Sequence, residues 1–248
     1  MSRLDQTLVA RGLAPTRSRA LDWIGRGLVS VDGRVVTKGG HRVAETAEIT
    51  LAQNVPRFVS RGAEKLIAAL DYFGLSPAGC HAADIGASTG GFTEVLLARG
   101  ATHVTAVDVG QAQLHPRLAA DTRVTGREQT DARQLTAADF AAPITAITAD
   151  VSFISLEKAL PCVLALAAPG AWLVALIKPQ FEVGRASVGK GGIVRDPAAS
   201  VAAVTRIAAW LETSGWQVAG TLPSPITGGD GNQEFLIAAH KNAMQRHD

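Results

Sequence analysis

The stretch "DIGASTGGFTEVLL", residues 84–97, leads from an apolar strand into a helix through a loop that holds three glycines. Glycine lets the backbone approach a bound ligand closely, and the first turn of the following helix, from about Phe92, offers free amides. A dinucleotide-binding loop reads G-x-G-x-x-G, whereas this loop reads G-A-S-T-G-G from Gly86. The stretch therefore predicts a strand–loop–helix unit with a ligand loop of another type.

Outward from this stretch, strand-like and helix-like segments alternate from Cys80 to the end of the chain. The predicted strands are 81–86, 102–107, 123–128, 145–150, 171–177, 217–221 and 234–240, and the predicted helices are 91–99, 111–120, 134–140, 155–167 and 198–213. This alternation predicts an α/β fold with a doubly wound parallel sheet. Ligands of such sheets bind beyond the carboxyl ends of the parallel strands, so residues that end a strand are candidates for chemistry.

Three of the predicted strands end in a charged residue. Asp108 ends "VTAVD", Asp150 ends "ITAITAD", and Lys178 ends the apolar run before Pro179, where proline stops the strand because it has no amide to donate. From its position Asp108 can accept hydrogen bonds from both hydroxyls of a ribose. If the last strand runs antiparallel to the others, Glu234 at its beginning lies at the same edge, beside Lys178.

A further lysine, Lys65 in "SRGAEKL", begins the helix that leads into the first strand and could cover the same edge. Taken alone, such a lysine is more often a solvated charge on a helix surface. Its assignment therefore depends on the context that the strand ends provide.

The composition indicates a globular protein of one large or two modest domains. The chain has 248 residues, of which 47% are hydrophobic and 19% charged. The longest mainly apolar stretch is 165–177, shorter than the roughly 20 residues of a bilayer span, and the first residues lack an apolar signal region. Cys80 and Cys162 are far apart, and the histidines show no ligand spacing. We expect a cytoplasmic protein with no membrane span, disulfide or metal.

The positive charge is concentrated in the N-terminal quarter. Residues 1–59 hold nine Lys and Arg against five Asp and Glu, while residues 60–248 hold fifteen against seventeen. Such an excess fits a nucleic-acid-binding module or an ordinary solvated face. The pattern predicts a helix over 3–11, a second helix capped by Thr16, and a hairpin that turns at Asp32-Gly33.

Residues 3–43, "RLDQTLVARGLAPTRSRALDWIGRGLVSVDGRVVTKGGHRV", resemble the S4 RNA-binding domain over nearly its full length. The resemblance implies a small α+β domain at 1–59, separated from residues 60–248 by a linker within 54–62. In that family the second helix and the following turn present basic side chains to structured RNA. The residues implied here are Arg3, Arg17, Arg19, Arg26, Arg34 and Lys38.

The acid two residues before the glycine-rich loop gives the pattern acid-x-Gly-x-x-x-Gly-Gly, which is similar to the first motif of S-adenosylmethionine-dependent methyltransferases. The resemblance implies a Rossmann-like class I domain with a seven-stranded sheet whose last strand is antiparallel. It also implies S-adenosylmethionine as the cofactor. The cofactor-binding residues implied are Asp84, Gly86, Ala87, Ser88, Thr89, Gly90, Gly91, Phe92, Asp108, Val109, Asp131 and Asp150. The family pattern places an aromatic residue near Gln111 and an asparagine near Asp131, and the chain departs from it at both positions.

Lys65, Asp150, Lys178 and Glu234 match, in order and context, the catalytic Lys-Asp-Lys-Glu set of FtsJ-like ribose 2'-O-methyltransferases. With the S4 domain and the motifs "DVSFISL", "LIKPQFE" and "GNQEF", the chain resembles the TlyA family, also labelled haemolysin A. This implies methylation of a ribose 2'-hydroxyl, on a cytidine, with ribosomal RNA or a ribosomal subunit as partner. Lys178 would contact the 2'-oxygen as a base or as a stabilising cation, with Asp150 and Glu234 orienting the lysines.

Other readings stay open from the sequence. One is a membrane-active haemolysin, for which we find no amphipathic or spanning element. Another is an RNA-binding assembly factor without turnover, and a third is a pseudouridine synthase, in which the cofactor loop would have no role. The glycine-rich segment 181–197, with Arg185, Lys190 and Arg195, is expected to be a mobile loop near the RNA.

Overall fold

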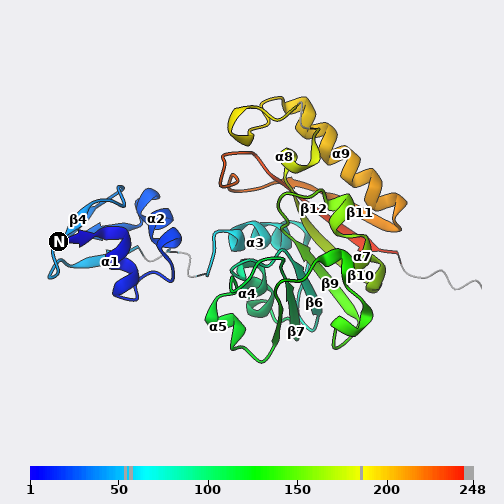
Figure 1. Ribbon diagram of the computed structural model, residues 1–248, viewed down its shortest axis with the longest axis horizontal. Coiled ribbons are helices and arrows are strands. Elements are labelled where there is room, and N and C mark those ends of the chain that lie inside the picture. The colour runs from blue at the N-terminus through cyan, green and yellow to red at the C-terminus, as the bar shows by residue number, and fades with distance from the viewer. Residues whose placement is uncertain (53–54, 56–57, 185–186, 243–248) are drawn as a thin grey trace, which may run out of the picture. The chain divides into compact units, whose positions relative to one another are not determined.

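The computed structural model describes residues 1–52, 55, 58–184 and 187–242. It divides the chain into two compact units, Met1–Arg61 and Gly62–Asp248 (Figure 1). Part of the linker expected at 54–62 (Asn54, Pro56 and Arg57) and Arg185 of the glycine-rich segment lie outside the described residues.

The first unit joins two helices to short antiparallel strands. The sheet order is β3-β2-β5, with β1 paired to β4 in a second sheet. The predicted Thr16 cap is confirmed, because its side chain accepts a hydrogen bond from the Arg19 amide at 3.2 Å. The predicted hairpin turn has positive φ at Asp32 (47°) and Gly33 (75°). The elements are β1 (Ser2–Arg3), α1 (Leu4–Ala10), α2 (Arg17–Gly25), β2 (Val29–Val31), β3 (Arg34–Val35), β4 (Arg42–Val43) and β5 (Ile49–Leu51).

The second unit is built on one seven-stranded sheet. In spatial order its strands are β11 (Trp216–Pro223), β12 (Phe235–Lys241), β10 (Ala167–Ile177), β9 (Ile144–Ala149), β6 (His81–Ile85), β7 (His103–Val107) and β8 (Val124–Arg127). The neighbours from β10 to β8 are parallel, while β12 is antiparallel to both β10 and β11. The predicted α/β fold and the antiparallel last strand are confirmed.

Helices cover both faces of this sheet (Figure 1). On one face α6 (Leu156–Ala159), α7 (Pro161–Leu166) and α9 (Pro197–Thr213) share a buried core with the strands, which includes Ile147, Leu173 and Ile237. On the other face lie α3 (Gly62–Phe73) and α4 (Gly91–Ala98), which contact each other. Successive side chains of a strand alternate between the faces, so Asp84, which bonds Thr93 of α4, points away from that core.

Three predicted helices were wrong in extent. The predicted helix 111–120 is only α5 (Pro116–Ala119), because the carboxylate of Glu128 holds the amides of Ala112, Gln113 and Leu114 in a loop. The predicted helix 134–140 is two 3₁₀ turns, Ala132–Gln134 and Ala137–Asp139. The predicted helix 155–167 breaks into α6 and α7 at Pro161, which has no amide to continue the hydrogen-bond ladder.

The sheet register brings the predicted strand ends to one edge. Ala149 of β9 pairs with Ile85 of β6 and with Ala175 of β10, and Ile177 of β10 pairs with Phe235 of β12. The residues that follow or precede these pairs therefore gather at this edge, as expected.

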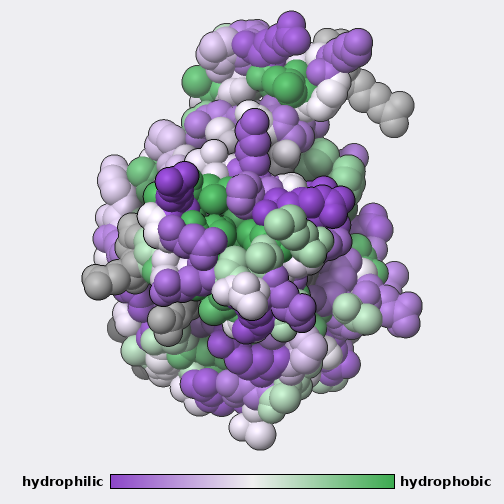
Figure 2. All heavy atoms as spheres, turned by 90° about the vertical axis from the view of Figure 1, so that its left-hand side faces the viewer, coloured by the Kyte–Doolittle hydropathy of each residue, from purple (hydrophilic) through white to green (hydrophobic). Residues whose placement is uncertain are grey.

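The surface is mixed in character. On the face shown in Figure 2, hydrophilic residues surround smaller groups of hydrophobic ones. Among the described residues, no helix has both the length and the apolar character needed to cross a membrane.

Candidate active site

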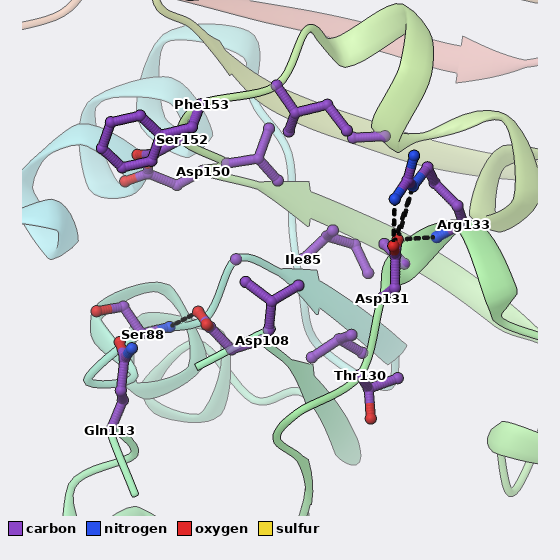
Figure 3. Close-up of a pocket in the computed structure, with 17 residues that line it drawn as sticks. Ile85, Ser88, Asp108, Gln113, Thr130, Asp131, Arg133, Asp150, Ser152 and Phe153 are labelled. Atoms are coloured by element: carbon purple, nitrogen blue, oxygen red, sulfur yellow. Dashed lines mark hydrogen bonds and ion pairs between the residues drawn. The ribbon is translucent and has the colours of Figure 1, made fainter. Parts of the chain in front are cut away.

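A cavity of about 440 Å³ opens at the carboxyl edge of β6, β7 and β9, a size typical of small-molecule sites (Figure 3). The loops that follow these strands supply its walls. The lining residues labelled in Figure 3 are Ile85, Ser88, Asp108, Gln113, Thr130, Asp131, Arg133, Asp150, Ser152 and Phe153.

The glycine-rich loop forms part of one wall and passes very close to the end of β9. A Cβ atom at Gly86 would lie 2.5 Å from the main-chain oxygen of Asp150, and the φ of Gly86 is 79°. Any larger residue there would separate the two loops. Ser88, exposed at the cavity, also has a positive φ of 47°. Thr89 continues the loop, and Gly90, Gly91 and Phe92 are buried at the start of α4, so they shape the loop from behind.

Asp108, directly after β7, ties two loops of the cavity together. Its carboxylate accepts a hydrogen bond from the amide of Ser88 at 2.8 Å (Figure 3) and another from the amide of Gly110 at 2.7 Å. A carboxylate has about four lone-pair sites, so these two bonds leave acceptor capacity for a ligand. Val109, the next residue, also lines the cavity and is mostly exposed.

Asp131 and Arg133 lie across the cavity from Ser88 and Gln113 (Figure 3). The Arg133 guanidinium donates to both carboxylate oxygens of Asp131, at 2.5 and 3.0 Å. These hydrogen bonds lower the pKa of Asp131 to about 2, so the group is negative at neutral pH. The sequence did not single out Arg133 or Gln113, and Gln113 lies two residues beyond the departure at Gln111.

The four predicted catalytic residues form two ion pairs. Nζ of Lys65 lies 2.5 Å from Oε2 of Glu234, and both side chains are buried. Nζ of Lys178 lies 2.6 Å from Oδ1 of Asp150 and also donates to Oγ of Ser152 at 2.8 Å. The strand register places Glu234 next to Lys178, as expected, but its ion-pair partner is Lys65.

Asp84 is placed differently from a ligand-contacting residue. It is fully buried in β6, where its two oxygens accept from the hydroxyls of Thr93 at 2.6 Å and Thr148 at 2.9 Å. Burial raises its pKa to about 6, against the lowering effect of the two threonines. We therefore correct its predicted role: Asp84 supports the loop and does not face the cavity.

Phe153 is the most exposed large apolar residue of the site. Its side chain is 91% exposed, its φ is 65°, and its ring centroid lies 5.1 Å from that of Phe181. A positive φ is rare for a bulky residue and is maintained only where the surroundings enforce it. The motif "DVSFISL" contained this residue and Ser152, but a sequence pattern alone gives neither exposure nor φ.

The basic residues of the first unit are placed unequally. Arg34 and Lys38 are exposed and line an open hollow with His41. Arg3 and Arg17, both partly exposed, pair with the buried carboxylate of Asp5 at 3.0 and 2.7 Å.

Three arginines of this unit, Arg19, Arg26 and Arg61, converge on Asp22. Arg26, on the surface, lies 3.7 Å from the Asp22 carboxylate. Arg19 is only 2% exposed, lies 3.3 Å from the same carboxylate, and stacks over the Trp23 ring. We therefore withdraw Arg19 from the predicted RNA-contacting set, because its guanidinium belongs to the interior of the unit.

Within the described part of the chain, no group of three or more His, Cys, Asp or Glu side chains could hold a metal ion.

Comparisons with known proteins identify the families to which the two units are similar. The FtsJ-like methyltransferase family matches residues 58–241, and the S4 domain family matches residues 2–49. The 16S/23S rRNA (cytidine-2'-O)-methyltransferase TlyA of Mycobacterium tuberculosis is 44% identical over 237 residues, which cover 95% of this chain and 88% of that protein. A solved structure of a candidate hemolysin from Streptococcus thermophilus is 40% identical, with a TM-score of 0.78, over 97% of this chain and 88% of the other.

A more distant solved structure shares the fold alone. It is the magnesium protoporphyrin IX methyltransferase of Synechocystis with bound SAH, which is 15% identical, with a TM-score of 0.51, over 73% of this chain and 82% of that one.

Proposed function

The chain belongs to the FtsJ-like methyltransferase family and carries an S4 domain ahead of its methyltransferase domain, and from this premise we propose that it transfers a methyl group from S-adenosylmethionine to a ribose 2'-hydroxyl, on a cytidine, of ribosomal RNA. One observation carries the proposal. Asp150 lines the small-molecule cavity and at the same time pairs with Lys178, so cofactor and acceptor groups would meet at this carboxylate. Residues 1–59 would bind RNA, and residues 60–248 would perform the transfer.

The cavity residues fit the proposed cofactor. Asp108 keeps acceptor capacity for the two ribose hydroxyls of a nucleoside, beyond the two amides that it already binds. Asp131, held negative by Arg133, can accept a hydrogen bond from an exocyclic amine. The close approach of the Gly86 loop to Asp150 brings the loop beside the ion pair. When bound, S-adenosylmethionine supplies a methyl group on a positively charged sulfur.

The lysines and carboxylates would align the acceptor hydroxyl and relieve it of its proton. Lys178, directly after β10, is proposed to contact the 2'-oxygen, with Asp150 and Ser152 fixing its side-chain nitrogen. To act as the base, its nitrogen would give a proton to bulk water and, as a neutral amine, take the proton of the 2'-hydroxyl. Lys65 and Glu234 form a buried support beside it. Alignment of the hydroxyl supplies most of the rate, since the sulfonium is a good leaving group.

The RNA would be bound by charge and by stacking. Arg34 and Lys38 around the open hollow, with Arg3, Arg17 and Arg26, are proposed to contact phosphates. Phe153 is exposed at the mouth of the cavity, where an aromatic ring can stack on an unpaired base. Stacking on Phe153 would place an RNA base at the carboxyl edge of the sheet. As the partner is ribosomal RNA, we also propose that the protein works in the cytoplasm.

The test is to incubate the full-length protein with labelled S-adenosylmethionine and each ribosomal subunit, and then to map the modified nucleotide. We expect label on the 2'-oxygen of a cytidine, lost in Lys178→Met. Binding of a subunit without methyl transfer would favour a non-catalytic assembly factor. Lysis of liposomes by the pure protein, with no methyl transfer, would favour the membrane-active reading.

A further inference from the structure

Glu182 ends α8 (Pro179–Glu182) and is almost completely buried, yet it takes no part in the two ion pairs described above. Its oxygen Oε1 accepts from the amide of Leu156 at 2.9 Å. Its other oxygen, Oε2, accepts from the hydroxyl of Ser155 at 2.7 Å and from the guanidinium of Arg206 at 2.8 Å. A buried carboxylate with three donors is a strong and specific anchor, because leaving those donors unpaired is costly.

The anchor joins the two segments that carry the reacting groups. One segment, 150–156, runs from Asp150 at the end of β9 to the start of α6. The other, 178–182, runs from Lys178 to Glu182 itself. Each segment directly follows a strand of the sheet, and Glu182 holds the two segments to each other at their last residues.

The two segments also meet between these ends. The Lys178 ammonium contacts Asp150 and Ser152, and the ring of Phe153 packs on that of Phe181. Phe153 keeps its positive φ of 65° in the middle of this span. A non-glycine residue remains in that conformation only while the chain on both sides is fixed, and Glu182 fixes one side.

Arg206, from α9, completes the anchor from outside the two segments. Its guanidinium donates to the Glu182 side chain, to the Glu182 main-chain oxygen at 2.9 Å, and to Glu157 of α6 at 3.2 Å. One side chain of the long helix α9 thereby contacts Glu182, which ends one segment, and Glu157, which directly follows the other.

We propose that Glu182 is a positioning residue that fixes segment 150–156 against segment 178–182, so that Lys178 and Asp150 keep their spacing and Phe153 its orientation when RNA is bound. The inference rests on the proposed function for the reaction that it serves. Glu182 touches neither cofactor nor substrate, and its effect is carried by the two segments.

The test uses Glu182→Gln in the full-length protein. Glutamine has the same shape but only one acceptor oxygen, so at least one of the three donors loses its partner. We expect amide hydrogen exchange in 150–156 to speed up at least about tenfold while exchange in β10 is unchanged. The single-turnover methylation rate should fall at least about thirtyfold, since small misplacements of reacting groups are costly. Affinity for S-adenosylmethionine should stay within about threefold, because Asp108 and the glycine-rich loop are untouched.

Glu157→Gln is the matched control. Glu157 also binds Arg206 but does not hold Ser155 or Leu156, so its loss should leave exchange and rate within about twofold of the parent protein. Unchanged exchange in 150–156, or a rate within about threefold of the parent for Glu182→Gln, would overturn the proposal. If Glu182→Gln does not fold, Ser155→Ala removes one donor and should give the same pattern more weakly. The exchange measurement needs no turnover, so it decides the anchor even if the chain methylates no ribose.

Discussion

The ammonium nitrogen of Lys178 lies 2.6 Å from a carboxylate oxygen of Asp150, and the two residues follow the ends of neighbouring parallel strands. Asp150 is also a wall of the small-molecule cavity. Under the proposed function, this pair would connect the cofactor cavity to the position of the acceptor hydroxyl. The proposed reaction depends on that connection, and it can be tested directly.

Lys178→Arg tests whether the lysine acts as a base. Arginine keeps the positive charge but does not give up its proton, so we expect the single-turnover methylation rate to fall at least about 100-fold. Lys158→Arg, on the exposed surface of α6, is the control and should change nothing. Undiminished activity in Lys178→Arg would rule out the base role.

Variants of the buried pair of Lys65 and Glu234 can distinguish an effect on stability from an effect on the methylation rate. Lys65→Met leaves an unpaired carboxylate inside the protein, which should cost about 3 kcal/mol of unfolding free energy. Adding Glu234→Gln should restore most of that stability but not the methylation rate. Urea unfolding and single-turnover assays measure the two effects. A double variant as active as the parent would show that the pair is only structural.

Because the Asp84 carboxylate is buried, we expect the stability of the protein to depend on pH. Burial raises the folded-state pKa of Asp84 to about 6, above its ordinary value of 3.8. Between about pH 4 and 6 the unfolded chain has released this proton while the folded protein still holds it, so the unfolding free energy falls as pH rises through this range. Asparagine is neutral at every pH. The unfolding free energy of Asp84→Asn, relative to that of the parent protein, should therefore rise by up to about 3 kcal/mol across that window, with no further change above it. Urea unfolding at several pH values measures the difference. Asp71→Asn, on the surface, is the control, and a pH-independent difference for Asp84→Asn would contradict the prediction.

We expect removal of the Glu128 carboxylate to change the affinity for the cofactor. Its carboxylate holds three successive amides of the loop that carries Gln113, and these hydrogen bonds lower its pKa below the ordinary range. Glu128→Ala should release the loop and weaken S-adenosylmethionine binding on the order of tenfold, because the loop must then be ordered on binding. Isothermal titration measures this, with the exposed Glu212→Ala as control. Equal affinities for the two variants would argue against the loop's role.

We expect removal of the Arg34 charge to change how the affinity for RNA depends on salt concentration. Arg34→Gln should weaken RNA binding and reduce the slope of log affinity against log salt by about 0.7 to 0.9, the value for one phosphate contact. Arg42→Gln, an exposed arginine of the same unit on β4, is the comparison and should alter the slope less. Filter binding over a series of salt concentrations measures both. The same slope change in both variants would mean general charge attraction, not the hollow around Arg34.

The sequence was most informative where a residue's function follows from its place in a strand. Asp108, Asp150 and Lys178 each end or follow an apolar run, and parallel strands bring such ends to one edge. The antiparallel direction of β12 likewise placed Glu234 at that edge. The predictions for Asp108, Asp150 and Lys178 needed only strand order and direction, while that for Glu234 also needed the antiparallel last strand that the family resemblance implies.

Predictions failed where they depended on side-chain partners. Arg19 is basic and lies on a helix, but its guanidinium points into the unit toward Asp22 and Trp23. The 111–120 segment has a helical pattern, but Glu128, distant in sequence, captures its amides. Long-range hydrogen bonds of this kind have no local signal, and the Glu182 anchor was missed for the same reason.

The bond between Lys65 and Glu234 joins residues 169 positions apart. Lys65 lies in the helix before the first strand of the sheet, and Glu234 begins its last strand, which must insert between β10 and β11. A chain that has not yet supplied residues 234–241 therefore cannot form this ion pair. A fragment that ends before β12 also lacks the strand that joins β10 to β11, and we expect it to transfer no methyl group.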